Sequence, residues 1–197
     1  MPANLALAVN ADATYVVVRE KDDEYVLAKD LMNKYFLNPK VVEEMKGKML
    51  AGIEYEPVFN YFVNKLEKKA WYIITAEFVS LNEGTGIVHT APAFGEDDYQ
   101  ACKKNNLPFI QPVTEEGKFS DEIKEFKGLF VKHADHKVIE YLQKKGDIFK
   151  VEHFMHSYPF CWRCNTPLIY YAVVSWFIKT TALKEKLIRL NKNINWY

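Results

Sequence analysis

The sequence has few cysteines, no net charge and no long hydrophobic run, and each of these absences excludes a class of protein. Three cysteines among 197 residues do not provide a disulfide framework. Lys and Arg number 26 against 26 Asp and Glu, so no overall positive field attracts nucleic acid without specificity. The longest apolar run, LIYYAVVSWFI, has eleven residues, where a membrane span needs about 18. We expect a globular, cytoplasmic protein that does not enter a membrane, and its first residues do not resemble a signal peptide.

The pattern of apolar residues predicts a mixture of strands and helices. Strands are predicted at 5–9, 14–20, 24–28, 70–80, 87–91, 149–158 and 166–178. Helices are predicted at 28–36, 39–46, 95–106, 134–145 and 182–193. Aromatic residues make up 15% of the chain, which favours strands. The predicted fold class is α+β, with a β-barrel or a strongly curved sheet surrounded by helices.

Three of these predictions depend on particular residues. Pro39 suits the first position of a helix after Asn38 as its cap. Gly84 and Gly86 mark a turn, so that 70–80 and 87–91 would form a hairpin. The aromatic pairs 170–171 and 176–177, like Cys102 on the helix at 95–106, are expected in the core.

Residues 84–100, GTGIVHTAPAFGEDDYQ, hold the densest group of chemically active side chains. Glu96, Asp97 and Asp98 fall in the first turn of a predicted helix, where free amides and the helix dipole favour carboxylates. One interpretation is therefore a helix cap. The other is a pocket in which a carboxylate accepts charge-assisted hydrogen bonds from an ammonium group. His89, at the end of a predicted strand, is a structural residue, a general base, a hydrogen-bond partner or a steric wall.

The segment from Gly84 to Pro92, followed by FGEDD at 94–98, closely resembles the editing domain of isoleucyl-tRNA synthetases. The related valyl and leucyl enzymes share the GTG opening but typically lack the His-Thr-Ala-Pro continuation. Two further stretches agree. PANLAL at 2–7 resembles the family's LPANLAL, and HSYP, CWRC, TPL and SWF at 156–177 resemble its trailing segment. The resemblance therefore runs along the whole chain.

The resemblance implies a role for each residue of this segment. Asp98 would hold the α-ammonium of a misattached amino acid, and His89 would limit the side-chain pocket. Thr90 would complete the catalytic group with Asp98 and His89. The implied substrate contacts are Gly84, Thr85, Gly86, Ala91, Pro92 and Phe94. The attacking group would be water, helped by hydroxyls of the terminal ribose, and editing would need no cofactor.

The resemblance also implies what surrounds the site. Residues 1–197 would be a single editing domain cut from a larger synthetase, with about 150–197 returning toward the synthetic domain. Its implied reaction is hydrolysis of valine from tRNA(Ile) after transfer, and the resemblance allows editing before transfer as well. Its partners would be the acceptor end of that tRNA and the synthetic domain, and the piece alone would be a monomer. HIGH- and KMSKS-type nucleotide signatures are absent from these residues. The family's TTTPWT-type segment is absent too, so we expect the piece alone to be impaired or inactive.

Cys161-x-x-Cys164 has the spacing of half a zinc site. A structural zinc needs four ligands, and the nearest further candidates are His153 and His156. In bacterial relatives a second cysteine pair lies upstream of the matched region, so we expect no zinc on these residues. The alternative function is a non-catalytic, RNA-binding, zinc-ribbon-like module.

Overall fold

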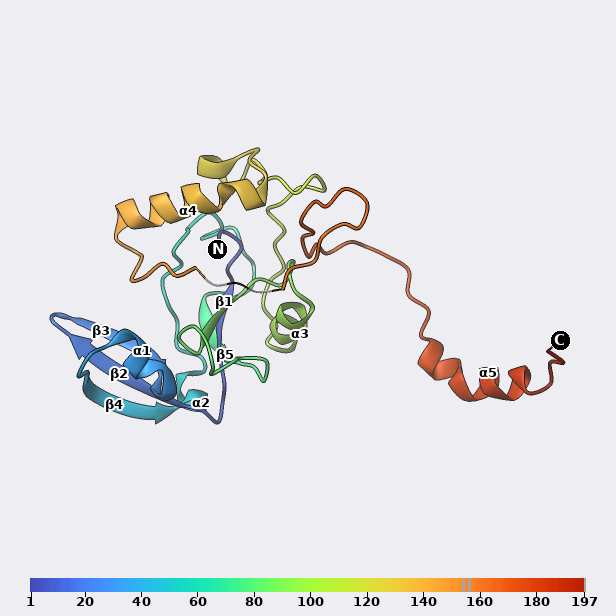
Figure 1. Ribbon diagram of the computed structural model, residues 1–197, viewed down its shortest axis with the longest axis horizontal. Helices are drawn as coiled ribbons and strands as arrows, with labels where there is room; N and C mark the ends of the chain where they lie inside the picture. Colours follow the sequence, from blue (N-terminus) through green and yellow to red (C-terminus); the bar gives the residue numbers. More distant parts are fainter. Residues whose placement is uncertain (154, 156, 197) are drawn as a thin grey trace.

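The computed structural model describes residues 1–153, 155 and 157–196, and two small sheets organise them (Figure 1). The strands are β1 (Ala6–Val9), β2 (Thr14–Glu20), β3 (Asp23–Ala28), β4 (Lys40–Lys46), β5 (Tyr72–Thr75) and β6 (Ile87–Thr90). The α-helices are α1 (Met32–Tyr35), α2 (Gly47–Leu50), α3 (Glu96–Lys104), α4 (Val131–Lys145) and α5 (Lys184–Asn191). Short 3-10 turns lie at η1 (Lys29–Leu31), η2 (Lys124–Phe126) and η3 (Thr180–Leu183).

The first sheet has the order β5-β1-β6 and carries the main core. β1 runs parallel to β5 and antiparallel to β6, so that Ala6 lies between Tyr72 and Thr90. Its apolar residues pack with side chains of α3 and α4, among them Cys102 and Ala134. Cys102 is buried, which confirms the prediction that it is a core residue. This packing sets the ends of β6, α3 and α4 around one region of the molecule.

The second sheet has the order β3-β2-β4 and lies beside the first (Figure 1). The bend between β5 and β6 joins the two sheets. The amide of Ala28 donates to the carbonyl of Thr85 at 2.8 Å, and the Tyr15 hydroxyl donates to that of Gly86 at 2.6 Å. A Cβ on Gly86, whose φ is +73°, would lie 2.5 Å from the Cβ of Ala28, so only glycine fits there.

The barrel-rich prediction is wrong: within the described residues the strands form two separate three-stranded sheets and no closed barrel. The predicted hairpin is wrong as well, because β5 and β6 lie on opposite sides of β1 instead of pairing with each other. The strand predicted at 70–80 is confined to Tyr72–Thr75. Short strands that pair over long sequence distances leave no local sequence signal of the strand order.

The helix predicted at 39–46 is instead the strand β4. Asn38 has a φ of +55° and does not cap a helix, and Pro39 leads into extended backbone. β4 pairs with β2, with Val41 opposite Val18 and a bulge beside it. The β-branched residues Val41 and Val42 favour this conformation once a partner strand is present.

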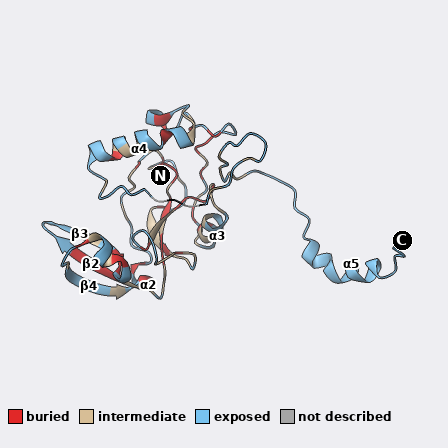
Figure 2. Ribbon diagram, viewed as in Figure 1, coloured by how far each residue is buried: buried red, intermediate tan, exposed pale blue. Residues whose placement is uncertain are grey.

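The C-terminal segment leaves the body of the molecule and ends in α5 (Figure 1). No strand forms among the described residues of 149–158 and 166–178; residues 154 and 156 lie outside the described part. Trp176 and Phe177 are 99% and 88% exposed, so the prediction that they lie in the core is wrong (Figure 2). Residues that favour strands form one only where a neighbouring strand supplies hydrogen-bond partners for their backbone N–H and C=O groups. None of the described helices is long and apolar enough to cross a membrane.

Candidate functional site

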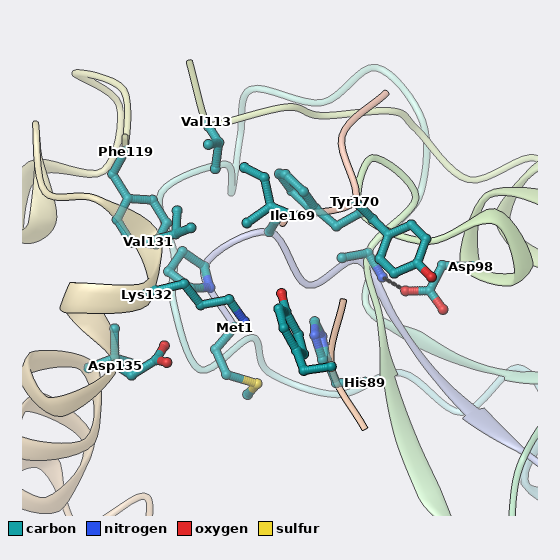
Figure 3. Close-up of a pocket in the computed structure, with 16 residues that line it drawn as sticks. Met1, His89, Asp98, Val113, Phe119, Val131, Lys132, Asp135, Ile169 and Tyr170 are labelled. Carbon is teal, nitrogen blue, oxygen red and sulfur yellow. Dashed lines mark hydrogen bonds between the residues drawn. The ribbon is translucent and has the colours of Figure 1, made fainter. Parts of the chain in front are cut away.

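A cavity of about 360 Å³ lies where the end of β6, the start of α3 and the start of α4 meet (Figure 3). Four of the predicted site residues line it: His89, Ala91, Phe94 and Asp98. His89 comes from β6 and Asp98 from the first turn of α3, so the turn between them brings both side chains to one space. The remaining wall is largely apolar and includes Val113, Phe119 and Val131.

Asp98 fastens the turn between β6 and α3. Its Oδ2 accepts a hydrogen bond of 2.9 Å from the amide of Ala91 (Figure 3). This bond reaches back into the turn, and no side chain caps the helix amides at Gly95. Asp98 therefore makes no cap hydrogen bond to the first amides of α3, but it lies in the first turn, where the helix dipole favours a carboxylate. Within the described residues the other carboxylate oxygen has no hydrogen-bond partner, which leaves it able to accept from a cationic ligand.

Burial raises the pKa of the Asp98 carboxyl, and the charge of Asp97 raises it further, against the lowering effect of the Ala91 hydrogen bond. The folded chain therefore binds this proton more tightly than the unfolded chain does. Its contribution to stability is present at low pH and is lost as pH rises through the folded-state pKa. The ionised carboxylate at neutral pH thus costs stability, as binding groups held ready for a ligand often do.

We predict that Asp98→Asn raises the melting temperature of the chain at pH 7, because it removes a desolvated charge and keeps an oxygen for the Ala91 amide. The gain should shrink as pH falls and Asp98 of the parent chain becomes protonated. Thermal unfolding at several pH values measures both effects. Asp97→Asn, an exposed neighbour on the same helix turn, is the matched comparison and should give a smaller gain, because it removes only the charge that raises the Asp98 pKa further. A melting temperature for Asp98→Asn that is equal to or below that of the parent at pH 7 would contradict the prediction.

His89 is neutral at physiological pH. Burial lowers the pKa of its imidazole to about 3. Its Nδ1 lies 3.3 Å from the Nδ2 of Asn4, a contact with the segment that leads into β1. A ring with so low a pKa is a poor general base near pH 7, since an efficient base has a pKa close to the working pH. The low pKa therefore argues against the base interpretation of His89, and the contact with Asn4 fits the hydrogen-bond interpretation.

The other predicted contacts lie outside the cavity lining. Thr90 and Pro92 are buried and do not line it, and the carbonyl of Thr90 accepts a hydrogen bond from the amide of Leu5 at 3.0 Å. The bend from Gly84 to Gly86 contacts the second sheet, as described above. Roles for these residues in substrate binding stay predictions.

The sequence patterns did not identify the far wall of the cavity. Lys132 and Asp135 enter it from the first two turns of α4, and Tyr158, Ile169 and Tyr170 enter it from the trailing segment. That segment is fixed by two bonds at Ala172: its amide donates to the carbonyl of Ala93, and its carbonyl accepts from Gln111, both at 3.1 Å. Tyr170, expected in the core, is 68% exposed and lines the cavity, whereas Tyr171 packs against the core.

Cys161 and Cys164 lie in a tight turn away from the cavity. The amide of Cys161 donates to the carbonyl of Thr166 at 2.9 Å, and a hydrogen bond from Thr166 lowers the pKa of the Cys164 thiol. Two thiols on one turn supply half of a zinc site. Among the residues that the structure describes, no group of three or more His, Cys, Asp or Glu could hold a metal, and His156 lies outside them. The expected absence of zinc stays a prediction.

The fold is similar to that of solved editing domains. The structure called GlLeuRS-CP1 superposes with a TM-score of 0.59 over 80% of each chain, at 13% sequence identity. The cytosolic leucyl-tRNA synthetase editing domain of P. knowlesi gives a TM-score of 0.51 over 87% of this chain and 80% of the other, at 14% identity. The chain therefore has the fold of the editing (CP1) domains of aminoacyl-tRNA synthetases.

Sequence comparison identifies the matching synthetase. Isoleucine–tRNA ligase of Clostridium kluyveri is 49% identical over 197 residues, and that of Chlamydia pneumoniae is 43% identical over 201 residues. Each match covers 100% of this chain and 19% of the ligase, so the chain spans about a fifth of the relatives it matches. No protein-family profile matches. The chain is thus homologous along its whole length to one stretch of isoleucine–tRNA ligase.

Proposed function

We propose that this chain is an editing domain that hydrolyses valine from mischarged tRNA(Ile) within an isoleucine–tRNA ligase. The observation that carries the proposal is that His89 and Asp98 line the same cavity of about 360 Å³. One side chain offers an acceptor for a cation, and the other offers a neutral, bulky wall. An aminoacyl ester presents the matching pair, an α-ammonium group and a side chain of a particular size.

Asp98 would select for an aminoacyl group over a simple ester. Its Oδ2 is held by the Ala91 amide, so the carboxylate has a fixed direction before any substrate arrives. The partly buried position strengthens the interaction with a cation. A positioned ammonium then fixes the ester carbon beside it for attack.

His89 would set the upper size of the amino acid. A single methylene in an apolar pocket changes binding by only about 1–3 kcal/mol, a limit for which isoleucyl-tRNA synthetase is itself the standard example. A synthetic pocket sized for isoleucine therefore admits valine. A second pocket that admits valine and rejects isoleucine removes the error, and His89 stands in the wall of such a pocket.

The chemical step would be attack by water on the ester carbon. The bond from that carbon to the ribose oxygen breaks, the ribose hydroxyl regains its proton, and valine leaves as a carboxylate. Lys132, in the wall contributed by α4, offers a positive charge to a phosphate of the terminal nucleotide or of a valyl-adenylate. The exposed apolar residues within 173–178, which are Val173, Val174, Trp176, Phe177 and Ile178, would contact the synthetic domain of the parent enzyme, in the cytoplasm.

The direct test is deacylation of valyl-tRNA(Ile) and isoleucyl-tRNA(Ile), measured as release of the labelled amino acid. The proposal expects the valyl ester to be hydrolysed faster than its spontaneous rate and the isoleucyl ester to survive. The chain is assayed alone and within the full-length ligase. Equal stability of both esters in the full-length ligase, or equal hydrolysis of both, would overturn the proposal.

A further inference from the structure

Asn4 connects His89 to the body of the fold through a set of directed hydrogen bonds. Its Nδ2 donates to the carbonyl of Ala6 at 2.8 Å and lies 3.3 Å from the Nδ1 of His89. Its Oδ1 accepts from the hydroxyl of Tyr55 at 2.6 Å. Its own carbonyl accepts from the indole of Trp71 at 3.1 Å. The amide is therefore bonded on both ends and cannot turn freely.

The direction of the amide follows from its neighbours. The carbonyl of Ala6 only accepts hydrogen bonds, so the side-chain atom facing it must be the NH₂ group. The oxygen then faces the Tyr55 hydroxyl, which donates to it. A flipped amide would place two acceptors against each other at Ala6. The group that faces His89 is consequently a donor.

A donor facing Nδ1 decides the tautomer of the ring. A neutral imidazole carries its proton on one nitrogen and a lone pair on the other. With the amide NH₂ beside it, Nδ1 of His89 must carry the lone pair and Nε2 the proton. The low pKa of the ring agrees with its being neutral. Two alternatives, a cationic ring and an Nδ1–H ring, would place hydrogen against hydrogen.

We propose that Asn4, itself held by Tyr55, is a positioning residue that fixes His89 as the Nε2–H tautomer in one ring orientation and so sharpens the size limit of the pocket. The size limit rests on the proposed function, whereas the tautomer of His89 does not. Without the bond at Nδ1 the ring can turn about its Cβ–Cγ bond. A ring that rotates limits the size of the pocket less strictly, because it can present either of its two edges to the side chain of the substrate.

The tautomer is measured by ¹⁵N NMR of the imidazole in the intact chain, with His89 assigned by its loss in His89→Gln. We expect a pyridine-like Nδ1 and a pyrrole-like Nε2 that do not change between pH 5 and 8. Asn4→Ala should give a mixture of tautomers. Asn33→Ala, an exposed asparagine on α1, is the control and should keep the parent spectrum. An Nδ1–H ring in the parent, or a parent-like spectrum in Asn4→Ala, would overturn the proposal.

Selectivity provides the second readout. In the full-length ligase, Asn4→Ala should lower the ratio of kcat/KM for valyl over isoleucyl esters by roughly 2- to 10-fold, the worth of one neutral hydrogen bond. The rate on the valyl ester itself should stay near the parent value. Should Asn4→Ala fail to fold, Tyr55→Phe removes the bond that holds the amide and should move both readouts in the same direction by less. A changed tautomer with unchanged selectivity would refute the role in size selection, and the NMR result stands even if the parent has no deacylase activity.

Discussion

Asp98→Ala is expected to lower kcat/KM for deacylation of valyl-tRNA(Ile) by roughly 10- to 150-fold in the full-length ligase. The substitution removes the acceptor for the α-ammonium, and a hydrogen bond to a charged group contributes about 1.5–3 kcal/mol. The loss should appear in both KM and kcat, because the ammonium anchors the ester in the attacking position. Steady-state deacylation over a range of substrate concentrations separates the two.

Two comparisons make this test specific. Asp97→Ala removes the same charge from the adjacent position, which is exposed and outside the cavity lining, and should keep the parent rate. A deaminated ester, which lacks the ammonium, should be hydrolysed equally by parent and Asp98→Ala. The raised pKa of Asp98 also means that activity should begin to fall, on acidification, at a higher pH than for an ordinary carboxyl. Parent-like kinetics of Asp98→Ala on the valyl ester would rule out the ammonium role.

His89→Ala is expected to make isoleucyl-tRNA(Ile) a substrate, raising its hydrolysis by roughly 10- to 200-fold, the range that one methylene controls in an apolar pocket. The reason is steric: the imidazole occupies part of the cavity wall, and alanine leaves space for the larger side chain. Hydrolysis of the valyl ester should change much less. The measurement is the ratio of the two rates in the same preparation.

His133→Ala serves as the control for this second substitution, since His133 is an exposed residue of α4 that does not line the cavity. If His89 acted instead as the general base, His89→Ala would abolish hydrolysis of both esters and leave their ratio unchanged. That pattern would exclude the wall role. The low pKa of His89 argues for the first outcome.

The central part of the site was predictable because it lies in one contiguous stretch. His89 and Asp98 are nine positions apart, on a strand and a helix joined by a short turn, and local patterns locate such elements well. The far wall was not predictable in this way. Lys132 and Tyr170 reach the cavity only through the packing of α4 and the trailing segment, and no pattern in the sequence assigned either of them to the site.

The errors in the fold have the same origin. The glycines at 84 and 86 indicated a turn correctly, but not that β1 would insert between the strands on either side of it. At 40–46 the helical spacing competed with β-branched residues, and pairing with β2 decided the outcome. Strand order and partner choice depend on contacts between distant segments, which periodicity within one segment does not report.

The trailing segment has a practical consequence for inhibitor design. Tyr158, Ile169 and Tyr170 close one side of the cavity, and Ala172 anchors that side to Ala93. In a shortened protein that ended after α4, the cavity would be open on this side. Compounds selected against that protein would be fitted to a surface that the longer chain covers. Screening material should therefore extend at least through residue 172, and chemical series can gain affinity by reaching the two tyrosine rings.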